Sequence, residues 1–437
     1  MSLLISLLEE LKRVCRTFPD AREGRSGNIE VEDFGLSAFS MFFMQSESFL
    51  SYQRALDKGH GRSNCQTLFG IGKIPTDNYI RDNLDPVDPG YLQPCFTRME
   101  QLLKEQPVMR QAFGRLGGRT LIAWDGTEYF CSYKINCPHC LTRKRSNGKT
   151  ESYHTLLSAT AVAPGTSRVV PLMPEFIANE DGAEKQDCER NAVKRWFGKH
   201  GARMKALRPV YLGDDLFACQ PVAEMVKANG DDFVFTCKET SHKALYDFMD
   251  GAAKEQHEEK TRKRATTETF RYRWMNDVPL RDGKDAMPVN WAGFQILDAK
   301  GKVKYTMAWV TSLPVSKENV AEIVACGRAR WKIENESFNV MKNHGYELEH
   351  NFGHGKQFLA MIMAAFNLLA FAWHSVLDLL EPPWQAAREA ATKRTRFFTT
   401  VVTLTSYLIF PSWSVFLKSI ATFDIPNDIL KTHGFPC

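Results

Sequence analysis

The sequence lacks the compositional biases that mark several protein classes. It has no low-complexity tract and no internal repeat, and 24% of its 437 residues are charged, as in an ordinary globular protein. Its formal net charge is only +5, so it lacks the large positive excess of many nucleic-acid-binding chains. A DNA-binding surface would therefore have to come from local clusters of basic side chains. The length is enough for two or three domains.

Signals for export are also missing. The first apolar run has no basic residues ahead of it and soon reaches Glu9, which predicts an amphipathic helix and not a signal peptide. The eleven cysteines are scattered and odd in number, in a chain too long to need a disulfide framework. We therefore expect a reducing, cytoplasmic location.

One apolar stretch, residues 358–377, is long enough to span a bilayer. It carries Asn367 and His374 and lies between segments of ordinary soluble composition. A helix that is buried on all sides in a large domain has the same pattern. We therefore predict a buried helix and no membrane partner.

The pattern of apolar and polar residues changes several times along the chain. Residues 1–112 are expected to be mainly helical, and either a DNA-binding module or a helical packing domain agrees with them. Strand-like and helical runs alternate over residues 113–237, which predicts a mixed α/β core with a central sheet. Residues 238–319 favour inserted antiparallel strands. The core is expected to resume over residues 320–385, before a helical C-terminal region at residues 386–437.

Three acidic residues have the setting of a metal site. Asp125 and Asp214 each follow a short apolar run, and Glu334 lies in a long helical segment, residues 320–343. Carboxylates at strand ends project from one edge of a sheet, and a helix that crosses this edge can bring the third acid beside them. Mg²⁺ prefers oxygen ligands, and two such ions about 4 Å apart promote displacement at phosphorus. The combination predicts phosphodiester chemistry, with Mn²⁺ as a substitute for Mg²⁺.

Each of these acids has a plainer interpretation when it is taken alone. An aspartate before a glycine, as at Asp125, is common in turns. Glu334 follows Arg330 at the helical spacing of an ordinary surface ion pair. Asp215 also competes with Asp214 for the role of second acid. The prediction therefore rests on the combination and on the residues beside each acid.

Three motifs extend this pattern. They are WDGT at 124–127, LGDDLF at 212–217, and RWKIE at 330–334 with Lys342 further along the same helix. Together they resemble the catalytic motifs of bacterial cut-and-paste insertion-sequence transposases, which belong to the DDE, RNase H-like superfamily. Residues 343–355 resemble the stretch that follows the catalytic helix in one branch of that family. The interval between the second and third motifs leaves room for the β insertion that such enzymes carry.

The resemblance implies an α/β fold in which an RNase H-like catalytic core carries an inserted, mostly antiparallel β subdomain and helical N- and C-terminal regions. It implies that Asp125, Asp214 and Glu334 are the catalytic residues and the Mg²⁺ ligands. It also implies that Arg330 and Lys342 contact DNA phosphates beside the ions.

The activity that the resemblance implies is that of a DNA transposase. Such an enzyme binds the terminal inverted repeats of its element, cleaves phosphodiester bonds there, and transfers the strand into target DNA. Acting on two ends implies a homodimer in a synaptic complex with double-stranded DNA, in the nucleoid of a bacterial cytoplasm. Two alternatives stay open: an inactive DNA-binding relative that acts as a repressor, and a nuclease of the same fold.

Two positions depart from the family pattern. Gly327 stands where the family helix often has a tyrosine, three residues before Arg330. The family lysine commonly falls at the position of Met341, and in this chain Lys342 follows it. The second departure keeps Glu336 open as a rival for the third acid.

A C-x2-C pair, Cys137 and Cys140, follows the first acid, with Cys131 before it and His154 after it. Four soft ligands of this kind could hold a structural Zn²⁺. A second C-x2-C is missing, however, and the spacing to His154 is irregular. The sequence therefore favours reduced thiols over a zinc site.

A basic run that includes Lys263 and Arg264 precedes the alternating segment 269–274, which holds arginines, a tyrosine and a tryptophan. Positive charge mixed with aromatic rings suits a DNA-binding groove in which bases stack on the rings. Glutamates between residues 255 and 259 also favour a solvated charged surface. We predict DNA contacts by Lys263 and Arg264, with the solvated surface as the alternative.

Overall fold

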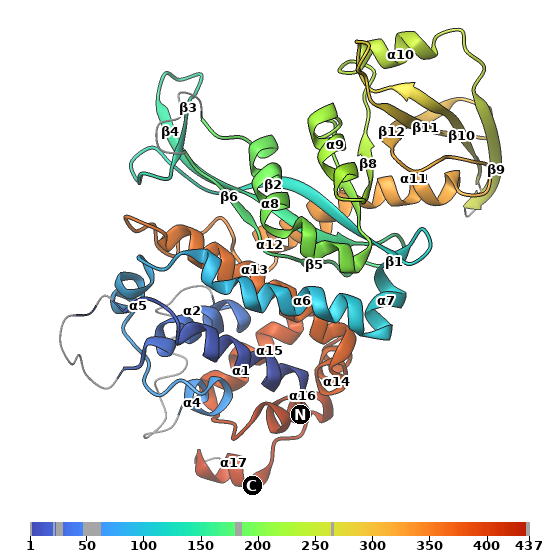
Figure 1. Cartoon of the computed structure of the whole chain (residues 1–437). Coiled ribbons are helices and arrows are strands. Elements are labelled where there is room, and N and C mark those ends of the chain that lie inside the picture. The colour runs from blue at the N-terminus through green and yellow to red at the C-terminus, as the bar shows by residue number, and fades with distance from the viewer. Residues whose placement is uncertain are drawn as a thin grey trace.

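The computed structural model describes residues 2–20, 22, 29–46, 63–179, 186–263 and 266–433, except the side chains of residues 263 and 266 (Figure 1). The chain is a mixed α/β protein in which helices form both ends and one large sheet lies between them. The predicted fold class is thus confirmed at the level of an α/β protein with helical termini.

The N-terminal region is helical because its apolar residues recur at the helical repeat. In the first helix, Leu4, Leu7, Leu8 and Leu11 form one buried stripe. The described helices before the sheet are α1 (Leu3–Cys15), α2 (Val31–Phe43), α4 (Asn64–Phe69), α5 (Asp77–Leu84), the 3-10 turn η1 (Pro89–Leu92), α6 (Gln93–Glu105) and α7 (Pro107–Phe113).

The described strands form one twelve-stranded sheet in the order β3-β4-β2-β7-β8-β12-β11-β10-β9, with β1 on β2, and β5 and β6 on β4. β2, β7 and β8 are parallel, whereas β4 is antiparallel to β2 and β9 to β12 are mutually antiparallel. The strands are β1 (Gly114–Arg115), β2 (Arg119–Ser132), β3 (Leu141–Lys144), β4 (Thr150–Val162), β5 (Val170–Pro171), β6 (Glu175–Ile177), β7 (Val210–Gly213), β8 (Asp232–Thr236), β9 (Glu255–Lys263), β10 (Thr266–Pro279), β11 (Pro288–Leu297) and β12 (Val303–Thr311).

The remaining helices lie among and after these strands. They are α8 (Glu189–Met204), the 3-10 turn η2 (Lys205–Leu207), α9 (Gln220–Ala228), α10 (Lys243–Met249), α11 (Val320–Ala329), the π-helical turn η3 (Ile333–Phe338), α12 (Asn339–Asn343), α13 (Leu359–Leu380), α14 (Pro382–Ala391), α15 (Arg394–Tyr407), α16 (Trp413–Thr422) and α17 (Asn427–Thr432).

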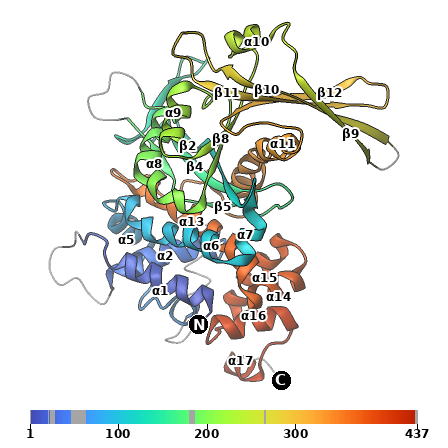
Figure 2. The same ribbon diagram turned by 45° about the vertical axis from the view of Figure 1, so that its right-hand side comes forward.

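The predicted antiparallel strands of residues 238–319 extend the central sheet. β12 pairs with β8 over three residues, from Trp309↔Thr236 to Thr311↔Val234. α11 packs against β8, β10 and β11, and Figure 2 shows this helix lying along one side of the extension. The chain segment after the extension, which carries the third acid, is thereby anchored to the sheet.

The long helix predicted at residues 320–343 is interrupted. α11 ends at Ala329, a π-helical turn follows at Ile333–Phe338, and α12 completes the segment. A π turn accommodates one extra residue, which rotates the following side chains by about 100° relative to a regular α-helix. Such turns are frequent at functional sites, and this one contains Glu334.

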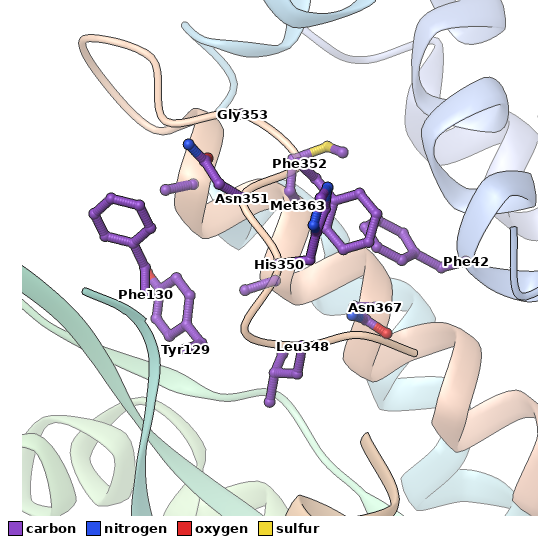
Figure 3. A pocket seen from close by; sticks show the side chains of 12 residues that line it. Phe42, Tyr129, Phe130, Leu348, His350, Asn351, Phe352, Gly353, Met363 and Asn367 are labelled. Atoms are coloured by element: carbon purple, nitrogen blue, oxygen red, sulfur yellow. The ribbon is translucent and has the colours of Figure 1, made fainter. Parts of the chain in front are cut away.

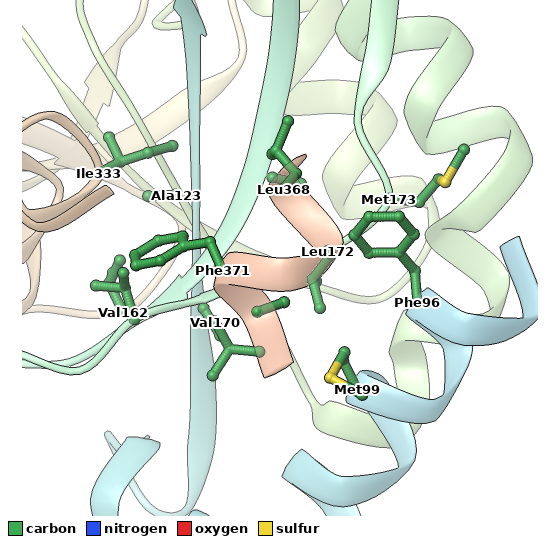
Figure 4. Packing of buried hydrophobic residues seen from close by; sticks show 14 of the residues in the cluster. Phe96, Met99, Ala123, Val162, Val170, Leu172, Met173, Ile333, Leu368 and Phe371 are labelled. Carbon is green, nitrogen blue, oxygen red and sulfur yellow. The ribbon is translucent and has the colours of Figure 1, made fainter. Parts of the chain in front are cut away.

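α13 is the core helix of the molecule. It is long and apolar enough to cross a membrane, but 94% of its most apolar window is buried inside the protein. It packs against α2, α6 and β5. Figure 4 shows Leu368 and Phe371 of this helix among Val170 of β5 and Phe96 of α6. The prediction of a buried helix is confirmed.

Candidate active site

Asp125 and Asp214 lie on neighbouring parallel strands. β2 and β7 pair in parallel up to Ala123↔Leu212, so each acid lies two residues beyond this pair. β7 ends just before Asp214, as predicted, whereas β2 continues past Asp125 alongside β4. Asp125 is therefore not at a strand end, but at the point where its parallel neighbour stops.

Arg330 connects Asp125 to the helical segment that carries Glu334. Its Nη1 lies 3.3 Å from Asp125 Oδ2, and its Nη2 lies 2.8 Å from Glu334 Oε1. The Arg330 side chain is only 10% exposed and the Glu334 side chain 44%, so the pair that the spacing allows joins a buried guanidinium group to an exposed acid. Two acids from distant segments thus share one buried cation.

Burial raises the pKa of Asp125 to about 7. The positive charge of Arg330 opposes this effect, and the negative charges of Glu334, Glu189 and Asp214 add to it. The four carboxyl groups are therefore close enough to influence one another. A carboxyl group whose pKa is raised by burial and by like charges is typical of a functional site.

Glu189 is a fourth acid that the sequence analysis missed. It is the first residue of α8, and burial together with the charge of Asp214 raises its pKa. A Cβ at Gly126 would overlap with the Glu189 carboxylate, so the glycine next to Asp125 permits their close approach. No pattern in the sequence singled out Glu189. Its position beside the site depends on how α8 packs on the sheet.

Two rival acids point elsewhere. Asp215 accepts hydrogen bonds from the backbone N–H of Lys238, at 2.7 Å, and from the Ser241 hydroxyl, which tie it to the turn before α10. Glu336 lines a separate cavity of about 210 Å³. Neither acid is among the main causes of the raised pKa of Asp125.

The acids do not form a compact metal-binding group. Among the described residues, one group of three or more His, Cys, Asp or Glu side chains has its ligand atoms within 4.8 Å of one another, and it is not this group. The guanidinium group of Arg330 lies between Asp125 and Glu334, where a metal ion would have to bind. A divalent ion would have to displace Arg330 and draw the carboxylates together.

Of the other predicted DNA-binding residues, Lys342 has a described side chain, and it pairs with an acid outside the group around Asp125. Lys342 Nζ lies 2.7 Å from Glu349 Oε1. Arg264 lies outside the described residues, and only the backbone of Lys263, at the end of β9, is described. Among the predicted DNA-binding side chains that the structure describes, Arg330 is the one in contact with Asp125.

The prediction that aromatic rings of residues 269–274 stack on DNA bases is wrong. Strand alternation places Tyr272 and Trp274 on the same face of β10, where both rings are buried. Arg271 and Arg273 project from the opposite face and contact polar side chains of β9. The rings belong to the core, so no DNA base can stack on them.

A second cluster contains the C-x2-C pair. The sulfur atoms of Cys137 and Cys140 lie 3.8 Å apart, and each lies 3.4 Å from Nε2 of His154. His354 Nε2 lies 3.5 Å from the Cys140 sulfur. All four ligand atoms lie within 4.8 Å of one another, so this cluster could hold a metal ion.

The structure adds a fourth possible ligand to the group that the sequence analysis considered. The missing ligand is His354, which is 214 residues from Cys140, so local spacing could not indicate it. Cys131 is exposed and outside the group. The pKa of the Cys137 thiol is lowered, chiefly by the hydrogen bond from Cys140 and further by His154 and His354.

No protein-family model matches the chain, and a search of curated proteins finds no match.

Proposed function

We propose that the chain is a DNA transposase with an RNase H-like core, which cleaves phosphodiester bonds at the ends of its element and joins them to target DNA. The observation that carries this proposal is the shared Arg330 contact between Asp125 and Glu334, with Asp214 on the neighbouring strand. Acids from all three resembling motifs therefore lie near one another, at the point where β7 ends beside β2. The mixed order β4-β2-β7-β8 supports the proposed core.

The acids would hold Mg²⁺, with Mn²⁺ as a substitute. Their donor atoms are carboxylate oxygens, which Mg²⁺ prefers, and a bound cation would favour the charged form of Asp125, which burial disfavours. A bound ion would activate the attacking oxygen and stabilise the leaving oxygen. The Cys–His cluster suits a different ion, because thiolate and imidazole ligands favour Zn²⁺ over Mg²⁺.

Asp125, Arg330 and Trp331 would each have a separate role in the proposed reaction. Asp125 has to lose its proton before it can bind a cation. The fraction of chains with a deprotonated Asp125 therefore rises as the pH increases through about 7. Arg330 would turn from the carboxylates to a DNA phosphate once the acids hold a cation. Trp331 beside it is 53% exposed and offers a ring on which a DNA base can stack.

The same proposal defines the partners. The substrate would be double-stranded DNA, both the terminal inverted repeats and the target. Two ends have to be held together during transfer, so a homodimer is expected in the synaptic complex. This chemistry would take place in a bacterial cytoplasm.

The test uses DNA that carries both ends of the element, incubated with the full chain and Mg²⁺. We expect Mg²⁺-dependent cleavage, and joining of precut ends to a target plasmid. Glu334→Gln should lower the cleavage rate by at least about 100-fold, because a metal ligand is lost. Glu336→Gln is the matched control on the same helical segment, and it should keep its activity because Glu336 lines another cavity.

Other outcomes identify the alternatives. Cleavage without joining would mean a nuclease of the same fold. Binding of the ends without any Mg²⁺-dependent cleavage would mean a DNA-binding repressor. Loss of activity in Glu336→Gln alone would assign the third acid to Glu336.

A further inference from the structure

The Cys–His cluster joins two parts of the chain that are far apart in sequence. Cys137 and Cys140 lie in the turn between β2 and β3, and His154 lies on β4. These three ligands therefore belong to one antiparallel unit, β2 to β4, which we call the β2–β4 hairpin. His354 lies in residues 344–358, the segment between α12 and α13.

We infer that Cys137, Cys140, His154 and His354 hold one structural Zn²⁺, which fastens the β2–β4 hairpin to residues 344–358. Four protein ligands fill a tetrahedral zinc shell and leave no position for a substrate, which is the arrangement of structural zinc sites. This inference goes beyond the proposed function and does not depend on it.

The spacing of the ligand atoms agrees with a tetrahedral zinc site. Zn–S bonds of about 2.3 Å and Zn–N bonds of about 2.05 Å place two sulfurs about 3.8 Å apart, and a sulfur and a nitrogen about 3.6 Å apart. The observed separations are 3.8 Å between the sulfurs and 3.4 to 3.5 Å between sulfur and nitrogen. A disulfide would need about 2.05 Å between the sulfurs, and both cysteines are free.

The backbone around the cysteines supports negatively charged sulfur. The N–H of Cys140 donates to the Cys137 carbonyl at 3.1 Å, which closes a tight turn. The N–H of Cys137 donates to the Cys140 sulfur at 3.4 Å. Hydrogen bonds to ligating atoms orient them and tune their affinity for the metal. Two thiolates would also neutralise the charge of a Zn²⁺ ion.

Burial of the ligand side chains is a second observation that supports a bound metal ion. Cys140, His154 and His354 are 4%, 1% and 8% exposed, so water has little access to the ligand atoms. The ligand atoms face one another in this space. A soft divalent cation would give all four a shared partner, and Zn²⁺ prefers this tetrahedral set of thiolate and imidazole ligands.

The ion would stabilise the contact between β2 and the loop of residues 344–358. The Phe130 ring lies 4.5 Å from the ring of His354, and the Tyr129 ring stacks 5.6 Å from that of His154. Figure 3 shows Tyr129 and Phe130 across a small cavity from the loop that contains Phe352. Without the ion, ring contacts such as Phe130 with His354 and His139 with Phe358 would remain between the hairpin and this loop.

The first test is the metal content of the full chain, purified under reducing conditions. We expect about one Zn²⁺ per chain by elemental analysis, and near loss of zinc in Cys140→Ser and His354→Gln. Cys131→Ser is the matched control, because it removes a nearby cysteine that is exposed and outside the cluster. Replacement by Co²⁺ should produce thiolate-to-cobalt absorption that His354→Gln weakens.

The second test needs no substitution, so it also applies if a ligand variant fails to fold. A chelator should lower the Tm of the wild-type chain by several degrees and expose residues 133–149 to protease, because binding to the folded state stabilises it. Added Zn²⁺ should reverse both effects, and added Mg²⁺ should not.

Two results would overturn the inference. One is a wild-type chain that contains no zinc and takes up none after reduction, and the other is a His354→Gln variant with wild-type zinc content and affinity. These measurements use neither DNA nor Mg²⁺. A fully zinc-loaded chain that cuts no DNA would therefore count against the proposed function alone.

Discussion

The surroundings of Asp125 disfavour the charged form of its carboxyl group. Burial and three neighbouring carboxylates raise its pKa to about 7, and Arg330 alone acts against them. Its pKa in the folded chain lies above the usual value, so the folded state binds more protons than the unfolded state between about pH 4 and 7. The stability that this group contributes is complete below about pH 4 and is lost as the pH rises through 7.

We predict that Asp125→Asn raises the free energy of unfolding at about pH 8 by on the order of 2–4 kcal/mol and changes it little at about pH 4. Asparagine keeps the shape of the side chain and removes the charge. Urea unfolding at both pH values, without divalent ions, measures the difference. Glu336→Gln is the control, because it leaves the group of acids around Asp125 intact. An equal effect of Asp125→Asn at both pH values would contradict the prediction.

At the scale of elements, the contact between α11 and β12 is so close that one helical position has no room for a side chain. A Cβ at Gly327 would lie 2.6 Å from Nε1 of the buried Trp309. The tyrosine that the resembling family often has at this position would not fit here. The Trp309 indole fills that space from the strand side.

We predict that Gly327→Ala lowers the free energy of unfolding by about 1–3 kcal/mol, although alanine is the better helix former. Urea unfolding measures the change. Gly198→Ala in α8 is the matched control, since a Cβ there meets nothing within 4 Å, and it should stabilise the chain by about 0.5–1 kcal/mol. Stabilisation by both substitutions would contradict the close packing of α11 on β12.

At the scale of the whole molecule, α13 is a central element among those that join the helical region to the sheet. It contacts α1, α2 and α6 on the helical side and β5 on the sheet side. Phe371 is 4% exposed and its ring lies 5.3 Å from that of Tyr346. Because this helix belongs to the core of both regions, they are expected to unfold together.

We predict that Phe371→Ala lowers the free energy of unfolding by about 3–5 kcal/mol, through lost burial and the cavity left behind. Tryptophan fluorescence and circular dichroism should still follow one common transition in urea. Tyr407→Ala, at a position that is 70% exposed, should change stability by less than about 0.5 kcal/mol. Two separate transitions in the wild-type chain would show that α13 does not couple the two regions.

Local patterns in the sequence determined several features by themselves. The apolar runs before Asp125 and Asp214 predicted two buried strands, and these strands are neighbours in the sheet. The apolar stretch at residues 358–377 predicted the buried helix α13. Such features follow from the repeat of a strand or a helix, which is recorded within about ten to twenty consecutive residues.

Only the tertiary structure decided which distant side chains meet. It brought His354 to the two cysteines, Glu189 to the glycine after Asp125, and Arg330 between two acids. It also decided that α11 covers the aromatic face of β10, so the rings predicted to bind DNA are core residues. These contacts depend on how whole elements pack, because burial of apolar faces sets the packing and no short spacing in the sequence records it.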